Sequence, residues 1–171
     1  MRLARYMAAV SAAVLLGLAG CCAAPLTPAQ LTAAGNAVEQ EVRQFAAAVS
    51  RDITQQGPAA WEKHFAASPA FFMASEGKLV FPNRQAATQA IEELKRTVQH
   101  IELSWGDDLR VDLLTPDFAV VASSWHEIQI DKEGHQTTDA GFFTGLAEHR
   151  QGQWQFRNAH WSVTAPAAGA K

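Results

Sequence analysis

Three residues near the C-terminal end of the chain have the types needed for proton transfer: Asp139, Asn158 and His160. Histidine titrates near neutrality, and a carboxylate beside it can fix its tautomer. We therefore predict His160 and Asp139 as candidate catalytic residues, with Asn158 orienting a ligand. Two alternatives stay open, a direct contact of His160 with a ligand without catalysis and a buried, purely structural histidine.

A metal site in this region is not favoured. His126, Asp139 and His160 are suitable zinc ligands by type. However, the sequence has no His-x-His or His-x-x-x-His spacing, and scattered ligands seldom form a site. It also has no P-loop, G-x-G-x-x-G, G-x-S-x-G or C-x-x-C motif. The sequence therefore predicts neither a metal nor another cofactor.

Strand alternation decides which side chains share a face with His160. A tight turn at 151–152 joins the last two expected strands, which pairs Phe143 with His160 and Phe142 with Trp161. If Ile130 pairs with His135 at the preceding turn, His126 lies opposite Asp139. A slip of one residue at that preceding turn would move His126 and its neighbour Trp125 to opposite faces.

This alternation predicts two faces with different roles. One mixes glycines, aromatic residues and a few polar groups, as small-molecule pockets do. Its candidate ligand-binding residues are His126, Phe143, Asn158, His160 and Ser162, with Phe81 at the pocket mouth. The other face carries Trp125, Phe142 and Trp161, and large exposed apolar patches usually meet a partner. We therefore predict a homodimer through this second face.

Capping and periodicity predict the elements that position these strands. A T-x-x-Q capping box at 27–30 begins a helix with an apolar stripe up to Ile53. Gly57-Pro58 ends that helix, and a short second helix ends before Pro69. A hairpin over 70–81 precedes a third helix that Asn83 caps. Strands are expected at 101–105 and 109–114 (as one bent strand), 118–130, 137–149 and 153–164. Helices first and long antiparallel strands last predict an α+β domain.

The amino-acid sequence of the C-terminal strands resembles that of a known family. The segment 154–162 (WQFRNAHWS) is similar to the W-x-I-x-x-x-H-x-S pattern of SnoaL-like and ketosteroid isomerase-like members of the nuclear transport factor 2-like superfamily. The segment 141–144 before the turn at 150–152 resembles their penultimate strand, and the hairpin over 71–81 also matches. Asn83-Arg84 departs from the Gly-Arg pair common there. The resemblance covers residues 28–164.

The resemblance implies a cystatin-like cone, in which N-terminal helices pack on the concave face of a curved, mostly antiparallel sheet. In the family the last-strand histidine, here His160, points into the cone. Members include isomerases, cyclases, dehydratases and binding proteins, so the fold does not fix the function. The isomerase oxyanion hole needs a tyrosine, and the only tyrosine is Tyr6.

We therefore expect a non-catalytic module that binds a small apolar ligand in the cone. One alternative is an enzyme of isomerase, cyclase or dehydratase type that uses His160 and Asp139 in proton transfer. A second alternative is a dimerisation scaffold without a cavity. Nucleic-acid binding is disfavoured, because Lys and Arg number 14 against 17 Asp and Glu.

The N-terminal residues have the three parts of a secretory signal. Two arginines precede an uncharged apolar run at 7–18, which is too short to span a membrane. The following Leu18-Ala19-Gly20-Cys21 resembles the bacterial lipobox, which implies acyl chains on Cys21 and attachment to a membrane. Ordinary cleavage after Ala24 and an uncleaved anchor are the alternatives.

Four parts are therefore expected: a lipoprotein signal peptide at 1–20, a tether at 21–27, the domain at 28–164 and a flexible tail at 165–171. Cys22 follows Cys21 where an aspartate would retain a lipoprotein in the inner membrane. By resemblance to Gram-negative sorting, the location is the cell envelope, lipid-anchored at the outer membrane and facing the periplasm. No cysteine follows Cys22, so the mature domain has no internal disulfide.

Overall fold

The computed structural model describes residues 27–164 of the 171-residue chain. The expected signal peptide, the lipidated Cys21, most of the tether and the tail therefore lie outside the described residues. No helix within 27–164 combines the length and the hydropathy needed to cross a bilayer.

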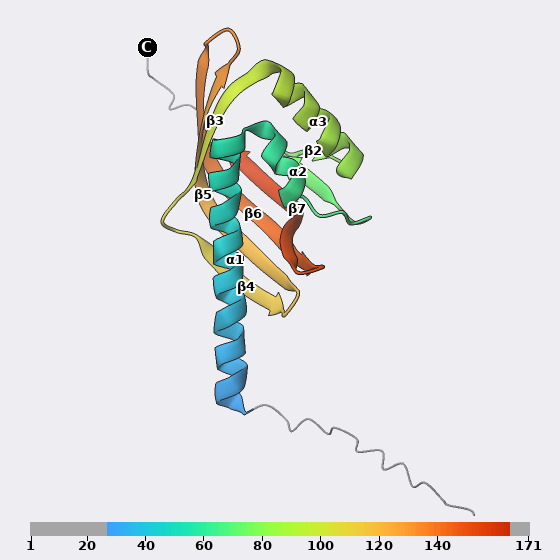
Figure 1. The fold of residues 1–171 in the computed structure, drawn as a ribbon, viewed down its shortest axis with the longest axis vertical. Coiled ribbons are helices and arrows are strands. Elements are labelled where there is room, and N and C mark those ends of the chain that lie inside the picture. Colours follow the sequence, from blue (N-terminus) through green and yellow to red (C-terminus); the bar gives the residue numbers. More distant parts are fainter. Residues whose placement is uncertain (1–26, 165–171) are drawn as a thin grey trace, which may run out of the picture.

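The longest element is helix α1 (Pro28–Gln56), and it begins at the expected capping box. The Thr27 side chain accepts from the backbone N–H of Gln30, whose side-chain oxygen accepts from the Thr27 N–H at 2.8 Å. Gly57 ends the helix with φ +72°, which favours glycine. In Figure 1, α1 crosses one face of the sheet, and its first turns extend past the strands.

Three further helical elements complete the helical layer among the described residues. A 3₁₀ turn, η1 (Pro58–Ala60), leads into the short α2 (Trp61–His64), and α3 (Arg84–Thr97) begins at the expected Asn83 cap. The Arg84 guanidinium donates to the backbone carbonyls of Phe65 and Glu62. This arginine therefore ties the start of α3 to the end of α2.

Seven strands form one sheet in the order β2-β1-β7-β6-β5-β3, with β4 also paired to β5. Among these seven described strands, only the β1–β7 pair is parallel. The expected bent strand is two separate strands, which pair with different halves of β5. The strands are β1 (Phe72–Ser75), β2 (Lys78–Phe81), β3 (Val98–Trp105), β4 (Arg110–Thr115), β5 (Phe118–Asp131), β6 (Gln136–Arg150) and β7 (Gln153–Val163).

The core lies between the helices and one side of the sheet, here called the inner face; the opposite side is the outer face. Val42, Val49 and Ile53 of α1 are fully buried. The Phe156 ring lies 4.8 Å from that of Phe45 and 4.9 Å from that of Phe143, measured between centroids. The expected α+β class, with helices on one face of a mostly antiparallel sheet, is confirmed.

The expected pairing of Phe143 with His160 is wrong, because a β-bulge interrupts the last hairpin. Leu146 pairs with Asn158, but the next residue, Ala147, pairs with Phe156, which leaves Arg157 as an extra residue. An extra residue reverses the alternation of every side chain beyond it. Phe143 therefore pairs with Trp161, and His160 turns to the outer face, where it is exposed.

The expected pairing of His126 with Asp139 is also wrong, because the preceding turn is one residue longer than expected. Ile130 pairs with Gln136 instead of His135. The side chain and the backbone of Asp131 both bond to His135 across the turn, and the His135 N–H donates to Asp131 Oδ1 at 2.8 Å. Glu127 consequently pairs with Asp139, while the exposed His126 lies on the outer face.

These two shifts also correct the expected dimer face. Trp125 and Trp161 lie on the inner face, where they pack against the core. Phe142 alone of the three lies on the outer face, with 45% of its surface exposed. The three residues therefore form no common patch.

Candidate functional site

A cavity of about 320 Å³ lies between the inner face of the sheet and helices α2 and α3. Its volume is at the small end of the range for ligand pockets. The cavity is lined by residues of α2 and the segment after it, of the β1–β2 hairpin, of α3, and of the long strands β3, β5, β6 and β7. They are Trp61, Phe65, Met73, Phe81, Ala90, Ile91, Leu94, Ile101, Leu103, Trp105, Trp125, Glu127, Gln129, Asp139, Phe143, Phe156, Trp161 and Val163.

Tryptophans are concentrated in the cavity wall. Four of the five tryptophans of the chain line it, namely Trp61, Trp105, Trp125 and Trp161. Trp61 stacks on Phe65 with 5.4 Å between ring centroids, and the Trp105 indole donates to the carbonyl of Ala46 at 2.7 Å. These contacts hold the rings of Trp61 and Trp105 in place before any ligand arrives.

Three polar side chains interrupt this apolar wall, and they come from two neighbouring strands. Glu127 and Gln129 follow Trp125 at alternate positions of β5, and Asp139 is the cross-strand partner of Glu127. Gln129 Nε2 donates to Glu127 Oε1 at 2.5 Å. Burial raises the pKa of Glu127 above its usual value, which the Gln129 hydrogen bond opposes and the charge of Asp139 reinforces.

The structure brings only part of the expected site together. Asp139, Phe143 and Phe81 line the cavity. His126, His160 and Ser162 do not line it, and the Asn158 amide instead donates to the carbonyl of Ala70 at 2.7 Å. Asp139 and His160 lie on opposite faces of the sheet, so they form no proton-transfer pair.

Sequence reasoning missed the polar residues Glu127 and Gln129 and placed Trp125 and Trp161 on the wrong face. The available signal was the alternation of residues 125, 127 and 129 along one strand. To assign these residues to the correct face of the sheet, one must also know the length of the turn after β5, which the sequence does not determine.

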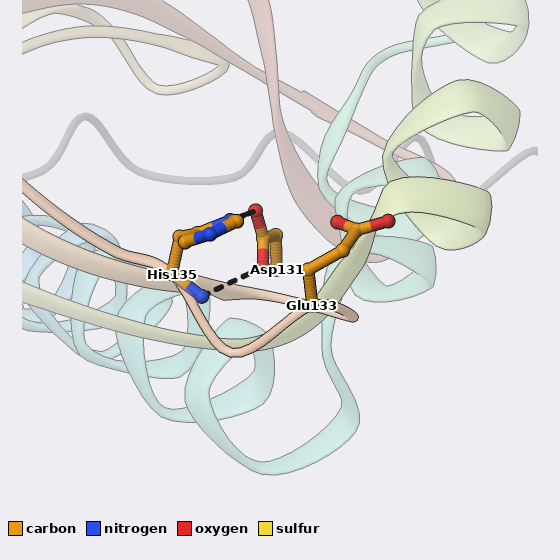
Figure 2. A group of neighbouring side chains, drawn as sticks. All are labelled: Asp131, Glu133 and His135. Carbon is orange, nitrogen blue, oxygen red and sulfur yellow. Dashed lines mark hydrogen bonds and ion pairs between the residues drawn. The ribbon is translucent and has the colours of Figure 1, made fainter.

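A second group of polar side chains lies at the tip of the β5–β6 hairpin. Atoms of Asp131, Glu133 and His135 that could bind a metal lie within 4.8 Å of one another (Figure 2). The His135 Nδ1 already lies 2.9 Å from Asp131 Oδ2. Desolvation alone would raise the pKa of Asp131, but its hydrogen bonds from His135 lower it below the usual value. We assign this group to closure of the turn.

No family model matches the chain, and no curated protein is similar to it in sequence. Solved structures do share its fold. A nuclear transport factor 2-like superfamily protein from Salmonella enterica serovar Typhimurium LT2 superimposes with a TM-score of 0.65 at 15% identity, covering 80% of this chain and 98% of that one.

Two other solved structures have the same architecture. A ketosteroid isomerase-like protein from Erwinia carotovora atroseptica gives a TM-score of 0.60 at 16% identity, covering 77% of this chain and 99% of that one. The hexachlorocyclohexane dehydrochlorinase LinA-type3 from Novosphingobium barchaimii LL02 gives 0.61 at 13% identity, with 81% and 95% covered. The chain therefore has the nuclear transport factor 2-like cone fold, as its C-terminal strands led us to expect.

Proposed function

We propose that this protein is a binding module that holds a small apolar molecule in the cavity of its cone. The observation that carries this proposal is the cavity of about 320 Å³ whose wall contains four tryptophans. Ligand pockets are typically concave and apolar, with a few polar groups that orient the ligand. A dimerisation scaffold without a ligand would not need this cavity.

A second candidate function is acid–base catalysis of the isomerase or dehydratase type. One observation favours it: the half-buried carboxyl of Glu127, whose pKa is raised, lies across from Asp139 on the next strand. Proton transfer works best with a group whose pKa is near the working pH. If the protein is an enzyme, Glu127 has the proton-transfer role that the sequence suggested for His160. Glu127→Gln would then abolish turnover, while the cavity would still bind the ligand.

Filling the cavity is expected to abolish binding. Ala90 lines the cavity from α3, so Ala90→Phe would place a ring in the space of the ligand. The probe is 1-N-phenylnaphthylamine, an uncharged dye that accepts energy from tryptophan and brightens in apolar surroundings. We expect saturable binding to the unaltered protein and at least a tenfold weaker affinity in Ala90→Phe.

Two matched variants control this experiment. Gln89→Phe puts the same ring on an exposed position of α3, and His160→Ala changes an exposed residue of the outer face. Both should bind the dye as the unaltered protein does. Equal binding by Ala90→Phe, or loss of binding in His160→Ala, would place the ligand elsewhere.

We further propose that the domain is attached to the bacterial envelope through acyl chains on Cys21, at the outer membrane and facing the periplasm. The signal pattern at 1–20 supports this attachment. Mass spectrometry of the mature protein from membranes is expected to find an acylated N-terminal Cys21. An unmodified chain that starts at Pro25 would refute it. A homodimer also remains a proposal, with no interface assigned.

A further inference from the structure

We infer that the cavity selects a hydrophobic cation: an apolar body that fills the tryptophan-lined space and carries an amine or quaternary ammonium beside Glu127 and Asp139. This inference rests on the proposed function, because it concerns the same cavity. The inference adds to that function the sign of the ligand's charge and the residues that recognise this charge.

Charge on the cavity wall has one sign. Glu127 and Asp139 are the only charged residues among the described residues that line the cavity, and no Lys, Arg or His joins them. The neighbours of Glu127 within the sheet are Gln129 on its own strand, Leu103 on β3 and Asp139 on β6. None of them is a cation.

Three basic side chains of α3 and of the β5–β6 hairpin tip already have other partners. Lys95, near the end of α3, lies 2.7 Å from Glu92, and Arg96 pairs with Glu93. Lys132, at the hairpin tip, donates to the carbonyl of Lys95 at 3.2 Å. The half-buried Glu127 and the exposed Asp139 thus receive no counter-ion from these three residues, and a cationic ligand would supply one.

Aromatic rings strengthen the preference for a cation. The faces of indole rings attract cations, and tryptophan does so best. Trp125 lies two residues before Glu127 on the same side of β5, so a cation near the carboxylate is also close to an indole. Trp61, Trp105 and Trp161 complete the wall. Carboxylates beside aromatic rings are a suitable environment for an ammonium group.

Ligands of other charge would bind less well. An anion would approach two carboxylates, and like charges repel. A neutral ligand would fill the same space but would gain no attraction from the two carboxyl groups. Burial raises the pKa of Glu127, and a cation bound beside this carboxyl would favour its ionised form again.

The test is competition of three matched compounds against bound 1-N-phenylnaphthylamine. They are (2-naphthylmethyl)trimethylammonium, its uncharged isostere 2-(2,2-dimethylpropyl)naphthalene, and 2-naphthylacetate. We expect the cation to bind about tenfold more tightly than the isostere, and the anion to bind at least tenfold more weakly. Glu127→Gln and Asp139→Asn should each lower the affinity for the cation several-fold and leave that for the isostere unchanged.

The isostere also reports on the cavity of each variant, because its unchanged affinity shows that the cavity is intact. Glu92→Gln, which removes an exposed carboxylate of α3 outside the cavity, should leave all three affinities unchanged. Equal affinity for cation and isostere, or cation binding that survives both cavity substitutions, would overturn the inference and leave the proposed function standing. Failure of both the dye and the isostere to bind would overturn the proposed function itself.

Discussion

Replacing Gly141 by alanine is expected to destabilise the protein by about 3 kcal/mol, the upper end of the range for overpacked sites. A Cβ atom on Gly141 would lie 1.8 Å from the carbonyl oxygen of Ser162 and 3.1 Å from the Trp125 Nε1. The oxygen belongs to the backbone of β7, so it cannot move without separating β6 from β7. Urea unfolding followed by circular dichroism measures the change.

Gly35→Ala is the matched control, and it is expected to change stability in the opposite direction. Gly35 lies inside α1, and a Cβ there would meet nothing within 4 Å. Alanine in a helix interior is more stable than glycine by roughly 1 kcal/mol. If Gly141→Ala were as stable as the unaltered protein, the pairing of Gly141 with Val163 would be wrong.

Replacing Phe156 by alanine is expected to cost about 3–5 kcal/mol, as for other buried phenylalanines. Only 1% of Phe156 is exposed, and its ring lies between those of Phe45 on α1 and Phe143 on β6. The substitution removes the contact that joins the helical layer to the sheet. Thermal and urea unfolding should both show the loss.

Phe142→Ala deletes the same side chain from the outer face, where 45% of Phe142 is exposed. Surface substitutions usually change stability by less than 0.5 kcal/mol. A cost similar to that of Phe156→Ala would mean that Phe142 is covered, for example by a second copy of the chain. Sedimentation of both variants separates that explanation from an error in the strand faces.

Signals between residues close in sequence predicted the elements well. The capping box at Thr27, the Asn83 cap and the glycine at 57 each act within a few residues, and all three have the expected roles. The expected strands 118–130, 137–149 and 153–164 differ from β5, β6 and β7 by one residue at one end or, for β6, at both ends. Long strands and caps are local properties, so the fold class follows from them.

Strand faces depended on signals that are not local. On β6, Asp139 and Phe143 lie on the inner face as expected. The pairing of its two neighbours with β6 differs by one residue from the prediction. For β5 the cause is the longer turn closed by Asp131, and for β7 it is the bulge at Arg157. The Arg157 guanidinium lies 5.6 Å from the centre of the Phe118 ring on β5. That contact spans three strands, and a single sequence does not reveal it.

The structure therefore has the expected cavity, but part of its lining differs from the prediction. Trp161 and Trp125 line the cavity where His160 and His126 were expected, and each lies one position away from that histidine along the same strand. A resemblance to a last-strand motif can locate a strand, but a single bulge decides which of its residues point inward.

The most direct test of ligand binding in the cavity is the ¹H–¹⁵N spectrum of the five tryptophan indoles during titration with 1-N-phenylnaphthylamine. Trp154 is the internal control, since its indole is directed to Glu41 of α1, 3.4 Å away, and it does not line the cavity. We expect the signals of Trp61, Trp105, Trp125 and Trp161 to move together and saturate, while that of Trp154 stays in place. Unmoved cavity signals at saturating dye, or an equal movement of Trp154, would contradict the account.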